Sequence, residues 1–580
     1  MNQIARRLIK RYVPITVWLP AYPREWLRPD LIAGLTSWGV MVPVALAYAG
    51  LAGMPAEVGL VTAFTALAAY AVFGTSRHLK VTTSSTMAIM AAAVVTPIAA
   101  SDPSRYVALS AALALVVGGL LLVAGLVRLG FLAQFMAKSV VTGFVIGLAI
   151  TIIVGQLPKL FGLPSASGDV FAQLAALLQG LAETNPWTLA VGSSALALIL
   201  FLRWLVPRLP GALVVLVLGI VASTAFDLAA HGVAVVGEVA TGVPLPGLPN
   251  VTLTDYALLV AGAGGIVFLA LAESLGAGRA FAARHGYELD ADQELVALGA
   301  ANLSAGLFGG FAVDASLSQS AAGEAAGTRS QVSALLTAAL MLATAMLLAP
   351  LFKNLPSAVL GAVVIAAVMS LIDVPEMRRY LDSRPVDFII AVAAMVGVIL
   401  TSPLAGMVIA VTLSLLVILF QASRPYIAVL GRVRGAAHVF GDVERHDAEQ
   451  LAGLLIVRPN VPLYFLNVTV AKDQILALVE SGPTPPRVVI LDLSATADLD
   501  ITTVDALREL AAGLRRRGIG LRLAQVRGSV RDRMLVTGLM ADLGEEAVFI
   551  ALDEAVAAPL PTAEPATLAP GAEAAETGPP

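Results

Sequence analysis

The sequence contains no cysteine and little charge. Among its 580 residues there is no Cys, and Asp, Glu, Lys and Arg together supply 13%. The absence of cysteine excludes disulfides, thiol nucleophiles and zinc sites with sulfur ligands. A soluble globular protein carries charge on about 25% of its residues. Much of this chain is therefore expected to face lipid instead of water.

The sequence also lacks the motifs of several functional classes. Its 5 histidines are scattered and form no H-E-x-x-H pair, and no G-x-x-x-x-G-K-[ST] loop occurs. A net charge of −4 leaves no concentrated basic face for nucleic acid. We therefore expect no enzymatic activity, no cofactor, no metal site and no nucleic-acid partner. Any uphill transport would have to be driven by an ion gradient.

Apolar residues are abundant, at 58% of the chain and a mean hydropathy of +0.86. Apolar stretches of about 20 residues recur between Asp30 and Gln421, each long enough to cross a bilayer, and we count about fourteen. The sequence therefore predicts an α-helical polytopic membrane protein embedded in the lipid bilayer, with its transmembrane domain at residues 30–423. Residues 1–29, which are rich in Arg and Lys, are predicted to form a cytoplasmic or interfacial segment.

Positive charges gather in alternate loops between the predicted spans. If the N-terminus is cytoplasmic, the basic loops are cytoplasmic too, and each opposite loop carries at most one positive charge. This bias predicts a multi-pass protein of the bacterial inner (cell) membrane with both termini in the cytoplasm. The basic residues assigned to cytoplasmic loops are Arg77, Lys80, Arg128, Arg203, Arg208, Arg279, Arg284, Arg329, Arg378, Arg379 and Arg384.

The composition changes after Arg424, where short apolar runs alternate with helical patterns. Strands are predicted at 453–457, 461–465, 487–493, 520–526 and near Val548, and helices at 501–517 and 530–539. Alternating strands and helices predict a small α/β domain at residues 424–556. Residues 557–580 are dominated by Pro, Ala, Glu, Thr and Gly and are predicted to be a disordered tail.

Two short polar segments occupy matched positions in an internal repeat. At an offset of 235 residues, Phe73-Gly74 aligns with Phe308-Gly309, and each pair precedes a cluster of hydroxyl residues. A half-helix that starts inside the membrane points its free N–H groups at an anion, and hydroxyls add donors. The predicted substrate-binding residues are Thr82, Thr83, Ser84, Ser85, Ser316, Leu317, Ser318 and Gln319. The alternative is that these small residues only let helices pack closely.

Glu273 lies in an otherwise apolar stretch that includes Gly264–Ala272. A carboxylate inside the membrane is costly and marks a functional candidate. Because burial disfavours its charged form, Glu273 is predicted to carry the coupling ion, a proton, near neutral pH. The alternative is a structural carboxyl bonded to a neighbouring helix, or one at the helix end near Arg279. Lys138 is expected to pair or snorkel, and Asp314 to cap a helix.

Several motifs, in order along the chain, resemble the SulP family of anion transporters. The resemblance covers about residues 25 to 555 and includes the STAS domain with which these proteins end. It is carried by Pro43–Ala49 with Leu51–Pro55, Gly74–His78, Ala315–Ser320 with Gly327–Gln331, Pro462–Asn467, Asp492–Ser494 and Asp500–Thr503.

The resemblance implies about fourteen spans in a 7+7 inverted repeat, a core domain that moves against a gate domain, and a homodimer. It places the substrate between the first, third, eighth and tenth spans, with Glu273 on the eighth. Two positions depart from the family pattern: Val44 stands where Gln is usual, and Gln319 where Arg is usual. Without that Arg, the site would rely on helix ends and hydroxyls, or the substrate would bring a cation. Thr502 is the residue nearest to the phosphorylated Ser of related STAS proteins.

These observations together predict a secondary active transporter of a small inorganic or carboxylic anion such as sulfate, bicarbonate or a dicarboxylate. Proton-coupled symport is the leading interpretation, with sodium as the alternative coupling ion. An uncoupled anion channel or exchanger is a second possibility. A membrane-anchored sensor that signals through the STAS domain is a third, although a sensor has no need of a carboxylate in the middle of the membrane.

Overall fold

The computed structural model describes residues 11–560 except 101, 132–136, 167, 207–208, 437 and 483. The chain forms two compact units, Met1–Leu415 and Leu416–Pro580, and each is described by itself. The predicted N-terminal segment and the predicted tail extend into residues 1–10 and 561–580, which lie outside the described residues.

The first unit is almost entirely helical. Within the described residues, 9 helices are long and apolar enough to cross a membrane, and four further apolar helices are shorter. A polytopic helical membrane protein is therefore confirmed, whereas the number of spans stays a prediction. The main helices are α3 (Leu27–Leu51), α4 (Ala56–Phe73), α5 (Ser85–Ala99), α6 (Pro103–Leu126), α7 (Lys138–Phe161), α9 (Pro186–Leu205), α10 (Gly211–Ala225), α11 (Leu253–His285), α12 (Ala291–Leu307), α14 (Val332–Ala343), α15 (Ser357–Val368), α17 (Pro385–Leu400) and α18 (Pro403–Ser423).

Shorter elements connect these helices. A π-helical turn, η5 (Thr344–Leu348), continues α14 and is followed by η6 (Ala349–Asn354). The others are α2 (Ile15–Trp18), η1 (Arg24–Trp26), α8 (Val170–Gly180), η3 (Leu181–Glu183), η4 (Leu228–His231), α13 (Leu317–Ala325), η7 (Met369–Leu371) and α16 (Val374–Ser383).

The bounds of α11 follow from its sequence. It starts with a capping box, in which the Thr252 side chain accepts the amide of Asp255 while the Asp255 carboxylate accepts the amide of Thr252. It ends at Gly286, whose φ of +65° suits glycine and stops the helix. Its 33 residues correspond to about 50 Å, which exceeds the hydrocarbon thickness of a bilayer.

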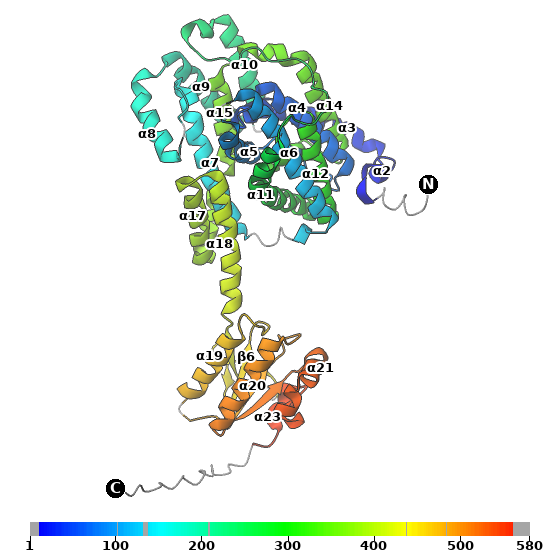
Figure 1. The fold of residues 1–580 in the computed structure, drawn as a ribbon, viewed down its shortest axis with the longest axis vertical. Coiled ribbons are helices and arrows are strands. Elements are labelled where there is room, and N and C mark those ends of the chain that lie inside the picture. The colour runs from blue at the N-terminus through cyan, green and yellow to red at the C-terminus, as the bar shows by residue number, and fades with distance from the viewer. Residues whose placement is uncertain are drawn as a thin grey trace, which may run out of the picture. The chain divides into compact units, whose positions relative to one another are not determined.

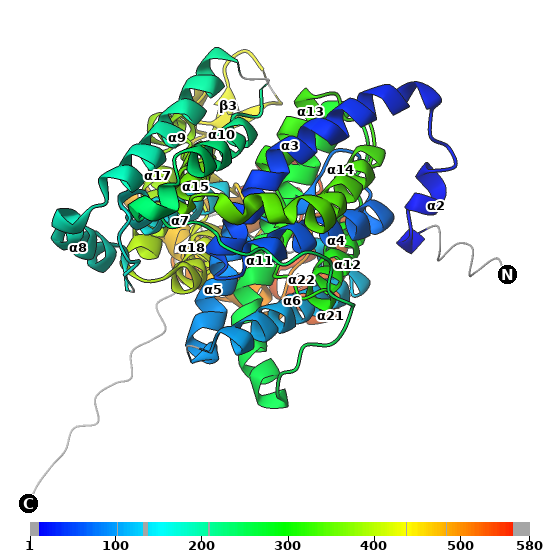
Figure 2. The same cartoon turned by 90° about the horizontal axis from the view of Figure 1, so that it is seen from above.

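The helices of the first unit pack in two groups (Figures 1 and 2). In one group, α12 packs along α6 and α4, and α14 packs on α3 and α4. The other group has α7 against α15 and α17, with α9 and α10 beside them. Close approach of α6 and α12 depends on glycine: a Cβ on Gly118 would stand 2.9 Å from the carbonyl oxygen of Gly299.

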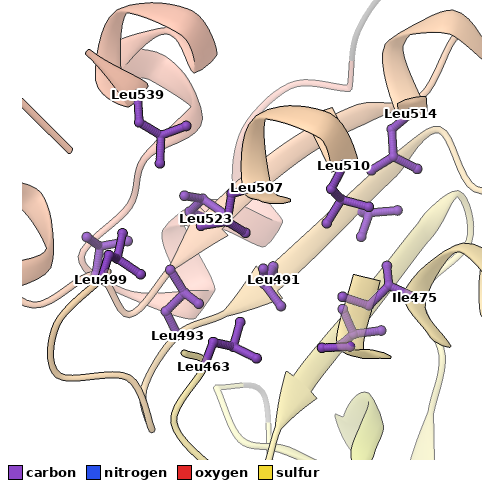
Figure 3. Packing of buried hydrophobic residues seen from close by; sticks show 14 of the residues in the cluster. Leu463, Ile475, Leu491, Leu493, Leu499, Leu507, Leu510, Leu514, Leu523 and Leu539 are labelled. Atoms are coloured by element: carbon purple, nitrogen blue, oxygen red, sulfur yellow. The ribbon is translucent and has the colours of Figure 1, made fainter. Parts of the chain in front are cut away.

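The second unit is built around a mixed sheet in the order β4-β3-β6-β7-β8, with β5 paired to β3. Its core lies between the sheet and helices, where Leu491 and Leu523 face Leu507 and Leu510 (Figure 3). This confirms the predicted α/β domain. Its elements are β3 (Ile427–Val433), β4 (Phe440–Asp442), β5 (Ala448–Glu449), β6 (Leu454–Pro459), α19 (Val468–Ser481), β7 (Val488–Asp492), α20 (Ile501–Arg516), β8 (Gly520–Ala524), α21 (Gly528–Thr537), α22 (Leu539–Leu543), η8 (Glu545–Ala547) and α23 (Leu552–Ala557).

One predicted strand of this domain is wrong. Residues 461–465 form the turn before α19, in which the Asn467 side chain accepts the amide of Tyr464 and donates to the carbonyl of Pro462. Pro462 has no amide hydrogen to give to a ladder. The antiparallel partner of β6 is β3, with Val429 opposite Val457. Strand β3 was not predicted from the sequence.

The first unit contains one short pair of strands whose partners are far apart in the sequence. Strands β1 (Val81–Thr82) and β2 (Asp314–Ala315) pair antiparallel, and they precede the short helices α5 and α13. The helices before them, α4 and α12, begin at Ala56 and Ala291, which are 235 residues apart. This spacing equals the offset found in the sequence, and the inverted repeat itself stays a prediction.

Candidate functional site

The candidate site is organised by the crossing of β1 and β2. Val81 lies opposite Ala315, and Thr82 lies opposite Asp314. The crossing is extended on either side, because the amide of Ser316 donates to the carbonyl of Lys80 at 3.0 Å and the amide of Lys80 donates to the Ser320 hydroxyl at 2.8 Å. Main-chain pairing, together with the Ser320 hydroxyl, therefore holds the starts of α5 and α13 together.

Side chains from α12 satisfy the backbone that leads into the crossing. Asn302 accepts the amide of Val313 and donates to its carbonyl, each at 2.9 Å. Glu294, which is 1% exposed, accepts the amides of Thr75 and Ser76 and the hydroxyls of Thr75 and Tyr70. Irregular backbone at membrane depth needs partners of this kind, since lipid offers none.

Serine hydroxyls cap both short helices. Ser84 Oγ accepts the amide of Met87 at 3.1 Å at the start of α5, and Ser316 Oγ accepts the amide of Gln319 at 3.5 Å at the start of α13. The hydroxyl of each serine keeps its hydrogen as a donor. The N-terminus of a helix carries partial positive charge, so the two starts together favour an anion.

Both helix starts open into one cavity of about 480 Å³. Six of the nine predicted site residues line it: Ser84, Ser85, Glu273, Ser316, Leu317 and Ser318. Tyr48 of α3 and Thr86 also line it, and the other wall comes from α7, α15 and η7. The cavity therefore lies where the two groups of helices meet.

Three predicted residues lie beside the cavity without lining it. Thr82 belongs to β1, and the buried hydroxyls of Thr82 and Thr83 have no hydrogen-bond partner among the residues that the structure describes. The side-chain amide of Gln319 donates to the carbonyl of Thr83 at 3.1 Å and is 3% exposed. In this arrangement Gln319 ties the start of α13 to that of α5.

Glu273 and Asp314 form a pair of neighbouring carboxyl groups at the buried end of the site. Asp314 is fully buried, and its carboxyl group lies beside the Ser84 hydroxyl and the Glu273 carboxyl group. Asp314 was predicted from the sequence only to cap a helix, but the residue that caps α13 is Ser316. The signal that could have found Asp314 is an acidic residue directly before the polar segment Ala315–Ser320.

Lys80 is another charged residue whose position the loop pattern did not predict. It is completely buried, and its Nζ donates to Ser333 Oγ on α14 at 2.6 Å. Its side chain points away from the cavity, since it is not among the lining residues and its Cε lies near Gly323 of α13. Lys80 thus joins α13 and α14 behind the site.

Comparison with protein-family models identifies both parts of the chain. Residues 27–394 match the sulfate permease family, and residues 445–555 match the STAS domain. A probable sulfate transporter of Mycobacterium tuberculosis is 34% identical over 547 residues, covering 94% of this chain and 98% of that protein. High affinity sulfate transporter 2 of Stylosanthes hamata is 30% identical over 94% of this chain and 86% of its own length.

Solved structures show the same fold. The murine anion transporter Slc26a9, in an inward-facing state, matches with a TM-score of 0.86 at 24% identity over 96% of this chain and 95% of that chain. The transmembrane domain of the cyanobacterial bicarbonate transporter BicA matches with a TM-score of 0.60 at 25% identity, over 66% of this chain and 98% of that chain.

Proposed function

This chain belongs to the sulfate permease family of anion transporters, and on that premise we propose that it is a proton-coupled symporter of a small anion. The observation that carries the proposal is the cavity that is lined by two helix starts and by Glu273, with Asp314 beside Glu273. Sulfate, bicarbonate and dicarboxylates all suit donors from serine hydroxyls and backbone amides. Relatives named as sulfate and bicarbonate transporters support the same range of substrates.

The anion would bind between the starts of α5 and α13. Ser84, Ser85, Ser316 and Ser318 offer hydroxyl donors there, and they line the cavity from opposite sides of the β1–β2 crossing. Thr82, Thr83 and Gln319 would support this end from behind. Neutral donors of this kind bind an anion without the desolvation cost of a buried cation.

The coupling proton would be carried by Glu273 together with Asp314. Two carboxylates in contact and shielded from water repel one another strongly, so such a pair holds one proton between them. A negatively charged pair beside the hydroxyls would repel the incoming anion, whereas a protonated pair would accept it. Binding of anion and proton is thereby linked. A sodium ion held by the same carboxylates is the alternative coupling ion.

We further propose the setting in which this activity occurs. The bias of positive charge between spans supports a bacterial inner membrane location with both termini in the cytoplasm. Residues 30–423 would form the transport domain and residues 424–556 the STAS domain. A homodimer is the assembly that we propose for the whole chain.

Uptake into proteoliposomes tests the proposal. Purified protein would be reconstituted and given radiolabelled sulfate, bicarbonate or succinate, with and without an inward proton gradient. Proton symport predicts accumulation above equilibrium only with the gradient, and Glu273→Gln is expected to abolish the stimulation while leaving anion exchange partly intact. Glu183→Gln, which changes an exposed carboxyl group in η3 that does not line the cavity, is the matched control.

Other outcomes would identify the rival functions. Uptake that never exceeds equilibrium and ignores the gradient would indicate an uncoupled channel or exchanger. Accumulation driven by a sodium gradient alone would replace the proton by sodium. Absence of flux for every anion, together with binding of one of them, would favour a sensor that acts through the STAS domain.

A further inference from the structure

The cavity has a second end, which differs in charge from the end that holds the serines. At the serine end Ser84 and Ser316 are buried and Ser318 is exposed, whereas Arg279 and Asp373 are exposed and the Lys138 side chain is 71% exposed. All six residues line the same cavity. We call the end formed by Lys138, Arg279 and Asp373 the cavity mouth.

Two of the three charged groups at the cavity mouth are already engaged. Lys138 Nζ lies 2.8 Å from the Glu376 carboxylate, which also binds Arg379 at 2.6 Å. The Asp373 carboxylate accepts the amide of Glu376 at 2.9 Å and so caps α16. The Lys138 and Asp373 side chains are therefore already bonded to protein groups.

Arg279 differs from these groups. Within the described part of the chain its guanidinium takes part in no hydrogen bond, ion pair or ring contact, while Arg284 on the same helix binds Glu324 at 2.7 Å. A guanidinium has five N–H donors and stays charged at every physiological pH. Among the residues that the structure describes, no acidic group forms an ion pair with this positive charge at the cavity mouth.

Arg279 lies on the same helix, α11, as Glu273 at the serine end of the cavity. It follows Glu273 by six residues, which is about 9 Å along a helix axis. Between them, Gly276 also lines the cavity, and nothing stands within 4 Å of the place where its side chain would be. The helix surface between the two charged residues is thus open to a small ion.

We propose that Arg279 forms a second anion-binding site at the cavity mouth, which takes up a small oxyanion before it moves to the serine end. The inference rests on the proposed transport function and adds a binding site to it. The planar fork of the guanidinium matches carboxylate, bicarbonate and sulfate, each of which presents two oxygens at once. At the serine end, Gln319 provides no fixed charge, so recruitment of the anion falls to Arg279.

A charge at the rim of a binding site acts mainly on association and on its dependence on salt. Loss of Arg279 should therefore raise the KM for the anion and leave the rate at saturating anion nearly unchanged. A purely structural role would instead lower the maximal rate or the amount of folded protein. The dependence of KM on ionic strength separates these roles, because salt screens an exposed charge.

The experiment uses the full-length protein in liposomes of neutral phosphatidylcholine. Initial uptake of sulfate, bicarbonate and succinate would be measured against concentration at low and high ionic strength for wild type, Arg279→Gln and Arg279→Lys. For the anion transported, Arg279→Gln should raise KM about tenfold at low salt and flatten its salt dependence. Arg279→Lys should keep the salt dependence but recover only part of the affinity, because an ammonium lacks the fork.

Arg378→Gln is the matched control, because it removes one positive charge from α16 without touching the cavity lining. If Arg378→Gln and Arg279→Gln change KM and its salt dependence equally, the cause is general surface charge and the proposal is overturned. An unchanged KM and salt dependence in Arg279→Gln would overturn it as well.

Equilibrium binding of sulfate, bicarbonate and succinate to the detergent-solubilised variants, followed by calorimetry, separates this inference from the proposed function. Wild type that binds an anion without carrying it would refute transport, while tenfold weaker binding by Arg279→Gln would still support the site. If wild type binds none of the three anions, both ideas fail.

Discussion

The side-chain amide of Gln319 donates a hydrogen bond to the main-chain carbonyl of Thr83, 3.1 Å away across 236 positions of sequence. The two residues belong to the starts of α13 and α5, which the β1–β2 pair also joins. This bond gives Gln319 a defined place beside the cavity. An arginine at position 319 would have the same Thr83 carbonyl within reach as an acceptor.

Gln319→Arg is expected to increase the affinity for sulfate relative to a monovalent anion such as formate. A guanidinium has five donors, so one can retain the bond to the Thr83 carbonyl while others reach the anion. The added fixed charge offsets the second negative charge of sulfate. Competition binding with the two anions measures the ratio, and an unaltered ratio would mean that position 319 serves only to hold the crossing.

Ser84→Ala and Ser318→Ala should each weaken anion binding without unfolding the protein. Removing one neutral hydrogen bond costs about 0.5–1.5 kcal/mol, which corresponds to a rise in Kd of about two- to tenfold. Titration of purified variants with sulfate or succinate measures this change. Ser193→Ala on α9, whose hydroxyl bonds only its own helix, is the control that should bind normally. If both variants bind as wild type does, the anion site lies elsewhere in the cavity.

Asp314→Asn should weaken the dependence of anion uptake on the proton gradient. An amide in place of the Asp314 carboxyl removes one of the two negative charges that would repel the anion, so release of the proton from Glu273 opposes anion binding less. Uptake with and without a pH gradient measures the effect. If uptake by Asp314→Asn still depends fully on the gradient, Glu273 alone carries the coupling proton.

Glu294→Ala should be among the most destabilising single changes in the membrane unit. Its carboxylate receives four hydrogen bonds from Tyr70, Thr75 and Ser76, and these buried or half-buried donors would all lose that partner. The expected loss is at least about 3 kcal/mol. The midpoint of thermal unfolding in detergent should fall by several degrees. The midpoint of Glu294→Gln should fall less, because its amide oxygen still accepts hydrogen bonds. An unchanged midpoint for Glu294→Ala would contradict this account.

The start of α20 in the STAS domain should loosen in acid. Burial works to raise the pKa of Asp500, but the amides of Thr503 and Phe465 donate to its carboxylate, each at 2.7 Å, and hold that pKa below its usual value of 3.8. A lowered folded-state pKa adds stability above about pH 4, and this stability is lost as the pH falls through the lower folded-state value. Hydrogen exchange of the first turn of α20, corrected for intrinsic rates, should therefore accelerate below pH 4. Asp500→Asn should remove that acid dependence.

The sequence predicted the parts of this molecule that repeat a strong local pattern. Long apolar runs, basic loops and the alternation after Arg424 depend on neighbouring residues, and they led to a helical membrane unit followed by an α/β domain. The hydroxyl clusters before α5 and α13 stood out for the same reason. Their meeting at one site was inferred from the internal repeat and from the family resemblance.

What the sequence could not predict depends on contacts between distant segments. Asp314 became a candidate only when Glu273, 41 positions away, was found beside it. Glu294 carries no sign in its own helix that it supports the turn after α4. Likewise, β3 is an ordinary apolar run whose partner, β6, begins 27 residues later. Side-chain partners such as these are decided by tertiary packing and not by local periodicity.

The main-chain pairing of β1 with β2 also bears on how such a transporter can change during evolution. Because Val81 and Ala315 are paired through backbone atoms, exchange of their own side chains leaves this pairing in place. If the serines bind the anion, as we propose, new anion preferences would arise there by single substitutions. An insertion or deletion of one residue in either segment would instead shift the pairing and rotate the side chains of the following helix by about 100° around its axis. Homologues should therefore vary in the residues of this crossing while keeping its length constant.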